Sequence, residues 1–208
     1  MIEKNVCYIV GAGDFDESRE AFLESDYIIA CDGGYEYLEK IGIKPDLIIG
    51  DFDSASAVPT GDNIIKLNPI KNDTDTFHAL MTGLEMGYKE FKIFGGTGGR
   101  ISHTLANIQA LSYLTKLGAK GYLIDRTSVI TAITNDIFSF GSDMKGYISV
   151  FSNGGISEGI TINGLKYELE DGTLDCDFSL GVSNEFIGKS GSISVKSGTL
   201  IIVYERQK

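Results

Sequence analysis

The segment LIIGDFDS, residues 47–54, decides the fold class of the first part of this chain. An apolar, strand-forming run is followed at once by a glycine and by two aspartates. Four other short apolar runs also end in glycine or aspartate, at residues 6–10, 27–30, 91–94 and 122–124. Continuous apolar runs of this length are typical of strands that are buried on both faces of a parallel sheet.

The segments between these runs carry apolar residues at helical spacing, which predicts helices over residues 16–24, 34–41, 74–87 and 102–117. Strands that alternate with helices predict an α/β domain with a Rossmann-like parallel sheet. Such sheets bind ligands beyond the carboxyl ends of their strands. Because every candidate motif in this part of the chain follows an apolar run, we expect the motifs to form one site.

From about residue 137 the pattern changes to short alternating runs separated by glycines, of which eleven lie between residues 141 and 198. The runs cover residues 147–151, 156–162, 193–195 and 200–204. This pattern predicts an antiparallel β-sandwich or a partial barrel. We therefore expect an α/β domain over residues 1–135, followed by a β-sandwich domain over residues 136–208.

Composition excludes some classes of partner. The 208 residues carry a formal net charge of −11, which argues against a nucleic-acid polymer because its phosphate backbone needs a basic face. A small phosphate ligand is not excluded, since bound metal ions can invert the local field, and a cationic substrate is favoured. No apolar run approaches the ~20 residues that span a membrane. The N-terminus lacks the regions of a signal peptide, and the three cysteines form no CxxC pair. We expect a cytoplasmic protein with reduced, buried thiols.

Asp51 and Asp53 form the first chemical motif. If the segment is extended, side chains two residues apart point the same way, so both carboxylates are presented together at a strand end. Two carboxylates this close repel each other, and a divalent cation is the natural third party. The alternative is a polar loop in which Asp53 or Ser54 caps a helix.

The second motif, Lys71-Asn72-Asp73-Thr74-Asp75, precedes a predicted helix. Asp73 or Thr74 can cap that helix, which is a purely structural role. Together with the first motif, however, it brings four acids and one lysine to two successive strand ends. Such a set fits Mg²⁺ held by protein oxygens and by a substrate phosphate.

The third motif, Gly95-Gly96-Thr97-Gly98-Gly99-Arg100, lies between an apolar strand and a helix. Glycines let backbone N–H groups approach a phosphate, and Arg100 can chelate its oxygens. A flexible turn is the alternative. His103 fits a base, a nucleotide contact or a hydrogen-bonded helix residue. The turns at residues 11–13 and 32–34 are also glycine turns at strand ends, and neither is specific alone.

Taken in order, these segments resemble the thiamine pyrophosphokinase (thiamine diphosphokinase) family, and the resemblance covers nearly the whole chain. The matching segments are residues 31–34, 50–54, 71–75 and 95–100, then His103 and Asn107, and finally Gly181-Val182-Ser183-Asn184-Glu185-Phe186. One departure stands out: the family usually has Arg-x-Asp-His where this chain has Arg100-Ile101-Ser102-His103. Ser102 keeps a hydrogen-bonding oxygen but carries no charge.

The resemblance implies Mg²⁺-dependent transfer of the pyrophosphoryl group of ATP to the hydroxyl of thiamine, which gives thiamine diphosphate and AMP. It also implies a homodimer in which the subunits share the thiamine site. The implied metal ligands are Asp51, Asp53 and Asp75, which with Arg100 are also the implied catalytic residues. The implied nucleotide contacts are Asp32, Gly33, Gly34, Lys71, Gly98, Gly99, Arg100, Ser102 and His103. Asp75, Ser183 and Asn184 are expected to contact thiamine.

Two other functions remain open at this point. An apolar strand followed by Asp-Phe-Asp-Ser is also found in phosphatases that form an aspartyl phosphate, with Asp51 as the nucleophile. That function leaves the glycine–arginine segment and the β domain unexplained. A non-catalytic thiamine or nucleotide sensor is suggested by Ser102. Without the family, Ser183-Asn184 would be a plain turn.

Overall fold

The structure is a computed structural model that describes residues 6–15, 22–23, 25–52, 61–68 and 73–207. Its internal contacts divide the chain into two compact units. The first is made of Met1–Ala110 with Gly121–Arg126, and the second of Leu111–Lys120 with Thr127–Lys208. The domain boundary that the sequence predicts at residues 135 and 136 stays a prediction.

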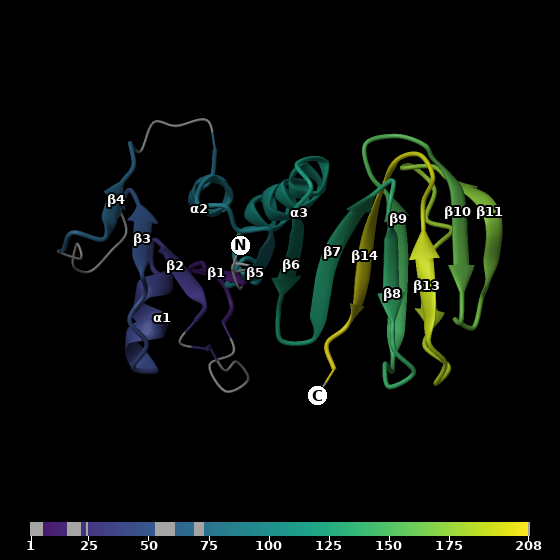
Figure 1. Ribbon diagram of the computed structural model, residues 1–208, viewed down its shortest axis with the longest axis horizontal. Helices are drawn as coiled ribbons and strands as arrows, with labels where there is room; N and C mark the ends of the chain where they lie inside the picture. Colours follow the sequence, from purple (N-terminus) through teal and green to yellow (C-terminus); the bar gives the residue numbers. More distant parts are fainter. Residues whose placement is uncertain (1–5, 16–21, 24, 53–60, 69–72, 208) are drawn as a thin grey trace. The chain divides into compact units, whose positions relative to one another are not determined.

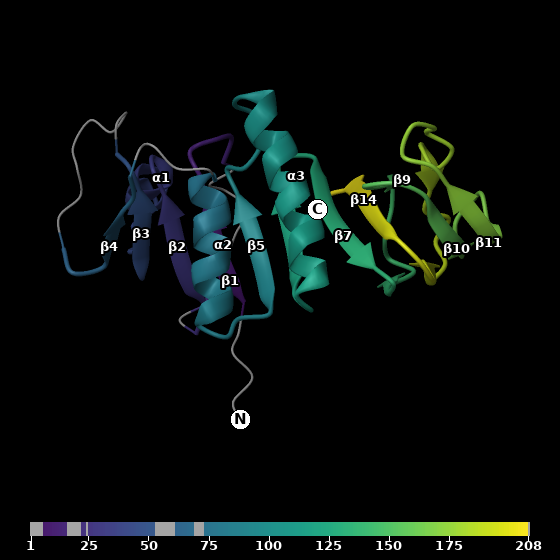
Figure 2. The same ribbon diagram turned by 90° about the horizontal axis from the view of Figure 1, so that it is seen from above.

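The first unit contains a parallel sheet with helices on both of its faces (Figures 1 and 2). Its strands are β1 (Cys7–Val10), β2 (Tyr27–Cys31), β3 (Leu47–Gly50), β4 (Ile64–Lys66), β5 (Glu90–Phe94) and β6 (Lys120–Ile124), in the order β6-β5-β1-β2-β3-β4. The pairs β1–β2, β1–β5, β2–β3 and β3–β4 are parallel. Helix α1 (Gly34–Lys40) lies on one face and α2 (Asp75–Glu85) on the other, while α3 (Ile101–Lys116) follows β5.

This arrangement confirms the mixed α/β class that the alternating runs predict. All four residues of β1 are buried, as expected for a strand that is covered on both faces. The sequence pattern missed β4, whose three residues are half-buried or exposed and which pairs on one side with β3. The helix expected over residues 16–24 falls almost entirely outside the described residues.

The order of the strands changes direction at β1. The chain moves from β1 to β2 and β3 on one side, but β5 pairs with the opposite side of β1. The turns after β1 and β5 therefore meet, and the N–H groups of Gly11 and Gly13 donate to the carbonyls of Phe94 and Gly95, each at 2.8 Å. Gly95 has φ +62°, and a Cβ there would lie 2.2 Å from the Gly11 oxygen. Only glycine permits this contact.

Apart from the end of α3, the second unit consists of antiparallel strands. One set has the order β12 (Asn184–Glu185), β9 (Tyr147–Ser152), β14 (Thr199–Glu205), β7 (Ser128–Thr134), and the other β11 (Leu169–Leu174), β10 (Ser157–Asn163), β13 (Gly191–Ser194), β8 (Ile137–Phe140). A single hydrophobic core takes side chains from both sets, including the fully buried Ile148, Ile160, Ile193 and Leu200. The antiparallel β structure expected after residue 137 is confirmed.

None of the described helices combines the length and the apolar character needed to cross a membrane. Cys7 and Cys31 are buried, as expected, but Cys176 is exposed, so the expectation of buried thiols is wrong at that position. Burial, with a smaller contribution from the charge of Asp46, raises the pKa of the Cys7 thiol to about 12. Cys7 is therefore a packing residue and not a nucleophile.

Candidate functional site

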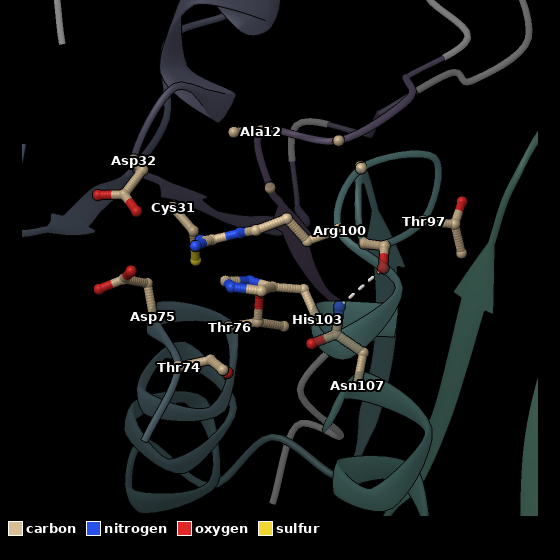
Figure 3. A pocket seen from close by; sticks show the side chains of 15 residues that line it. Ala12, Cys31, Asp32, Thr74, Asp75, Thr76, Thr97, Arg100, His103 and Asn107 are labelled. Carbon is tan, nitrogen blue, oxygen red and sulfur yellow. Dashed lines mark hydrogen bonds between the residues drawn. The ribbon is translucent and has the colours of Figure 1, made fainter. Parts of the chain in front are cut away.

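A cavity of about 310 Å³ opens at the carboxyl ends of β1, β2 and β5 in the first unit (Figure 3). The turn at residues 11–13 and the loop after β5 form one part of its wall. Asp32, directly after β2, and Asp75, the first residue of α2, supply two carboxylates. Arg100, directly before α3, and His103, in its first turn, supply two basic side chains. The expectation that motifs following different strands come together is thus met by Asp32, Asp75, Arg100 and His103.

The glycine loop after β5 is held in place from beneath. The side-chain amide of Asn107, which is buried, donates to the Gly96 oxygen at 2.8 Å. A Cβ on Gly96 would lie 2.6 Å from the Leu123 side chain. Gly99 also lines the cavity, yet a Cβ there would meet no atom within 4 Å. Packing therefore explains the glycine at position 96 but not the one at position 99.

Gly98 has a different role from the nucleotide contact that the sequence suggests. Its φ is +79°, and a Cβ there would lie 2.1 Å from the carboxyl carbon of Asp14. It is not among the residues that line the cavity. Gly98 makes the turn possible, and its nucleotide contact stays a prediction.

One face of α3 is directed into the cavity. Arg100, His103 and Asn107 follow helical spacing and all line it (Figure 3). Ser102 lies on another side of the first turn and is exposed. The residue at which this chain departs from the family pattern is therefore not part of the cavity wall, and its role as a nucleotide contact also stays a prediction.

The two carboxylates of the cavity point toward each other (Figure 3). Asp75 is the first residue of α2, and Thr74 caps that helix by accepting a hydrogen bond from Phe77 N at 3.2 Å. Asp73, the other possible cap, contacts His78 at 3.4 Å instead. Opposite Asp75, the Oδ1 atom of Asp32 is buried and has no hydrogen-bond partner among the described residues.

Asp32 is consequently difficult to ionise. Burial, followed by the hydrogen bond and charge of Asp75 and then by the charge of Asp51, raises the pKa of the Asp32 carboxyl to about 7. A hydrogen bond from the Phe52 backbone N–H acts in the opposite direction. Keeping two facing carboxylates ionised at a buried position costs free energy, which a bound cation would offset. The pair is therefore a candidate cation site.

The backbone at this point is unusual, because Asp32 and Phe52 both adopt left-handed conformations, with φ values of +43° and +58°. The extended conformation of β3 therefore ends before Phe52. This corrects the argument that Asp51 and Asp53 point the same way as residues of one extended segment. Asp51 is half-buried and does not line the cavity, and Asp53 lies outside the described residues, as does Lys71.

The described part of the chain contains no group of three or more His, Cys, Asp and Glu side chains that could hold a metal ion. The pair Asp32 and Asp75 still fits Mg²⁺, which is usually bound through one or two carboxylates together with water and substrate phosphates. The buried, unpartnered oxygen of Asp32 is the observation that supports this fit. Asp32 was expected as a nucleotide contact, so the structure suggests a second role for it.

Burial and then the positive charge of Arg100 lower the pKa of the His103 imidazole, although the charge of Asp75 acts in the opposite direction, so the neutral form is favoured. A neutral imidazole can accept a proton or a hydrogen bond in the cavity. Sequence reasoning did not select Ala12, Cys31, Thr76 or Thr97, which also line it. The glycine turn at residues 11–13 was the available signal for Ala12.

Gly33 and Gly34, at the start of α1, do not line this cavity. A Cβ on Gly34 would lie 1.9 Å from the Val10 oxygen, so this glycine lets α1 begin against β1. Gly33 instead lines a neighbouring cavity, together with Ala12, Asp32 and Phe52.

In the second unit, Ser183 and Asn184 differ from each other. Ser183 has φ +62°, is exposed, and its backbone N–H donates to Ser149 Oγ at 3.1 Å. Asn184 is buried, and its side-chain amide bonds both backbone polar groups of Tyr167, at 2.7 and 2.9 Å. Asn184 therefore holds the Tyr167 backbone, while the Tyr167 side chain is 60% exposed. Sequence reasoning missed Tyr167, because only the fold brings it beside Asn184.

Comparison with known proteins gives a consistent result. The family model "Thiamin pyrophosphokinase, catalytic domain" matches residues 18–123, and "Thiamin pyrophosphokinase, vitamin B1 binding domain" matches residues 135–200. A thiamine pyrophosphokinase of Bacillus subtilis (strain 168) is 33% identical over 84% of this chain and 85% of its own length. Thiamin pyrophosphokinase 1 of Caenorhabditis elegans is 25% identical over 90% of this chain and 82% of its own length.

The crystal structure of a thiamine pyrophosphokinase from Bacillus subtilis is similar to this one with a TM-score of 0.86 and 28% identity, covering 98% of this chain and all of the other. The first family model alone matches about half of the chain, and the two together span both units. On this evidence the chain belongs to the thiamine pyrophosphokinase family.

Proposed function

We propose that this protein transfers the pyrophosphoryl group of ATP to the hydroxyl of thiamine, with Mg²⁺, and releases thiamine diphosphate and AMP. The enzyme class, a thiamine diphosphokinase, follows from the family. The observation that carries the finer proposal is the cavity at the strand ends, where a glycine loop and Arg100 lie across from the facing carboxylates of Asp32 and Asp75.

The polyphosphate of ATP has suitable partners on one side of this cavity. The backbone at Gly99 is accessible, because this residue is exposed and carries no side chain. The Arg100 guanidinium adds a fixed positive charge with paired donors. These groups bind and orient the phosphates and stabilise the charge that builds up on them during transfer.

Asp32 and Asp75 would hold Mg²⁺ together with phosphate oxygens, and Asp51 and Asp53 remain proposed ligands. The ion supplies charge neutralisation for the polyphosphate when it is bound. The raised pKa of Asp32 supports this role. A cation that arrives with the nucleotide would stabilise the ionised form of both carboxylates, which is costly without it.

In the reaction, the thiamine hydroxyl oxygen forms a bond to the β-phosphorus as the bond from that phosphorus to the α–β bridging oxygen breaks. AMP leaves with the bridging oxygen, and the hydroxyl loses its proton. We assign Asp75 to orienting the hydroxyl and accepting this proton. Since phosphoryl transfer depends mainly on positioning and charge stabilisation, a moderately basic carboxylate is sufficient.

Thiamine carries a positive charge, which suits a chain with a net charge of −11. In the second unit we propose Ser183 as a direct contact and Asn184 as the residue that positions Tyr167. The exposed Tyr167 ring can pack on a flat cation, and Lys166 Nζ lies 5.6 Å from its centroid. We further propose a homodimer that shares the thiamine site, a cytoplasmic location, a Rossmann-like first unit and a sandwich-like second unit.

The experiment that tests the site is Asp75→Asn. Loss of the proton acceptor should lower kcat by about 10²- to 10⁴-fold while ATP binding changes far less. Asp73→Asn is the matched control, because Asp73 lies two residues away, contacts His78 and does not line the cavity. Near-wild-type turnover of Asp75→Asn, or equal losses in both variants, would remove Asp75 from the chemistry.

A further inference from the structure

The glycine loop after β5 has two halves that differ in exposure. Residues 95–97 are buried, whereas residues 98–100 are exposed. The exposed half, which ends at Arg100, is the proposed phosphate contact. The buried half is the base of the loop, and its conformation determines where Gly99 and Arg100 lie.

Four successive carbonyl groups, of residues 94–97, accept hydrogen bonds at the base of the loop. Three of the donors are backbone N–H groups in residues 11–14, at 2.8, 2.8 and 2.9 Å. The fourth donor is the side-chain amide of Asn107, which lies 2.8 Å from the Gly96 oxygen (Figure 3). Of these four donors Asn107 alone is a side chain, so this contact depends directly on the identity of the residue.

Gly96 and Asn107 are matched to each other. A Cβ on Gly96 would lie 2.9 Å from Asn107 Nδ2, so the missing side chain lets the amide reach the backbone. Asn107 itself is only 3% exposed. Without the bond to Gly96, this amide donor would be buried and unpaired, which costs free energy because its hydrogen bonds to water are lost.

The hydrogen bond fixes the direction of one peptide group. In a trans peptide the C=O of Gly96 and the N–H of Thr97 point in opposite directions, so a donor that holds the oxygen holds the whole plane. Glycine tolerates many backbone conformations, and a peptide plane beside Gly96 can otherwise rotate at low cost. Rotation of this plane would change the direction in which the chain enters Gly98 and Gly99.

Asn107 also belongs to the helix face that carries the basic side chains of the cavity. Arg100, His103 and Asn107 follow one another at intervals of three and four residues, and all line the cavity. The bond from Asn107 therefore joins the base of the loop, at Gly96, to this face of α3. Gly99 and Arg100 lie between the two joined points, so their positions are constrained from both ends.

We propose that Asn107 is a positioning residue for the polyphosphate. Its amide keeps the glycine loop in the conformation that binds phosphate, with Gly99 and Arg100 placed together, and it touches no atom that reacts. This inference rests on the proposed ATP-dependent function. It adds the residue that prepares the loop before the nucleotide arrives.

The test compares the wild-type protein with Asn107→Ala by calorimetry in Mg²⁺, with ATP and inorganic tripolyphosphate as separate probes. If the loop of the variant occupies its binding conformation about one-tenth of the time, the Kd of both probes should rise about tenfold. In steady-state assays the KM for ATP should rise by a similar factor, and the KM for thiamine by less than about twofold. A purely structural defect would reduce the amount of folded enzyme and would not raise one KM selectively.

Ser112→Ala is the matched control. Ser112 is a buried residue of the same helix, its hydroxyl accepts a hydrogen bond from the Asn153 amide at 2.8 Å, and it does not line the cavity. This variant also loses a hydrogen bond of α3, but its Kd for tripolyphosphate should stay within about twofold of wild type. Asn107→Ser, a smaller change that also removes the amide, should weaken tripolyphosphate binding as Asn107→Ala does. Thermal unfolding verifies that each variant is folded.

Three results would overturn the inference. In folded Asn107 variants the Kd of tripolyphosphate could remain at the wild-type value, the KM values for ATP and thiamine could rise by equal factors, or Ser112→Ala could weaken tripolyphosphate binding as much as Asn107→Ala. In each case the proposed reaction could still stand, since AMP formation by the wild-type protein is measured separately. Conversely, tripolyphosphate binding that depends on Asn107 without any AMP formation would contradict the proposed function and leave the role of Asn107 intact.

Discussion

Asp32 combines three energetically unfavourable features of the site in one residue. It is left-handed, one of its oxygens is buried without a partner among the described residues, and a second carboxylate faces it. Each of these features costs stability in a protein without a bound cation. Gly50 contributes to the arrangement, because a Cβ at that position would lie 2.2 Å from Asp32 Oδ1. The glycine that ends β3 therefore makes room for the carboxylate that ends β2.

The raised pKa of Asp32 predicts a pH dependence of stability. Between about pH 4 and pH 7 the folded chain retains a proton that the unfolded chain has already released, so the free energy of unfolding falls as the pH rises through this window. With chelator present, Asp32→Asn should flatten this fall. The Tm of the variant relative to wild type should therefore increase from pH 5 to pH 8, as measured by thermal unfolding.

The exposed Asp62 supplies the control, since Asp62→Asn should leave the pH dependence as in wild type. Mg²⁺ at pH 8 should stabilise the wild-type protein more than Asp32→Asn. Parallel stability curves for wild type and Asp32→Asn, in chelator and in Mg²⁺, would show that the carboxylate pair is not under strain.

At the level of single residues, the sequence predicted those that share one local element. Arg100 and His103 enter the cavity together because they are one helical turn apart, and Asp75 enters because it begins α2. The facing position of Asp32 and Asp75 depends on how β2 and α2 pack, which no local pattern reports. No local pattern reports the left-handed conformation of Phe52 either. The common direction of Asp51 and Asp53 was therefore inferred from an extended backbone, which the chain does not have at Phe52.

Among the elements, the loop after β5 has two kinds of glycine. Gly95 is required by the fold, since its φ is +62° and its Cα lies against Gly11. Gly99 has open space around it and no such conformational requirement. Because packing does not explain Gly99, we expect that the ligand does, through close approach of its phosphates to the backbone.

The two glycines therefore predict opposite results for the same substitution. Gly95→Ala should destabilise the fold by roughly 1–3 kcal/mol or more, because a Cβ collides with backbone in a left-handed conformation. Gly99→Ala should change the free energy of unfolding by less than about 1 kcal/mol, yet raise the KM for ATP about tenfold by overpacking the phosphate site. Unfolding curves and ATP kinetics of both variants test this, and an unaltered KM in a folded Gly99→Ala variant would contradict it.

Element prediction succeeded for many continuous or alternating apolar runs, but it missed β4, β8 and β12 and also the longer strands β7 and β11, which have seven and six residues. β1, β2, β3 and β5 were recognisable from continuous buried runs, and β9, β10 and β14 from alternation. β4 has three residues and β12 has two, so neither provides enough of a period to detect. Their pairing is set by neighbouring strands rather than by their own residues.

At the scale of the whole molecule, each unit supplies a different part of the proposed chemistry. The first unit holds two adjoining cavities, and we propose the one that contains Arg100 as the phosphate site. The second unit holds Tyr167 against Asn184. The net charge of −11 argues against a nucleic-acid polymer and favours a cationic acceptor. The identity of that acceptor came from the family motifs, because composition alone gives only its charge.

The departure at Ser102 bears on whether the protein is a catalyst or a sensor. Since Ser102 is exposed and does not line the cavity, the loss of the family's acid leaves the facing carboxylates and Arg100 unchanged. Ser102→Asp should accordingly have a small effect on turnover. The geometry favours an active enzyme over a non-catalytic sensor.

The most direct test of this account is to incubate the protein with ATP, thiamine and Mg²⁺ and to measure every phosphorus-containing product. The account predicts AMP and thiamine diphosphate in equal amounts, with no thiamine monophosphate and no orthophosphate. Orthophosphate with a phosphorylated Asp51 would indicate a phosphatase, and binding of both ligands without AMP would indicate a sensor. Either result would contradict the central claim that this cavity transfers a pyrophosphoryl group.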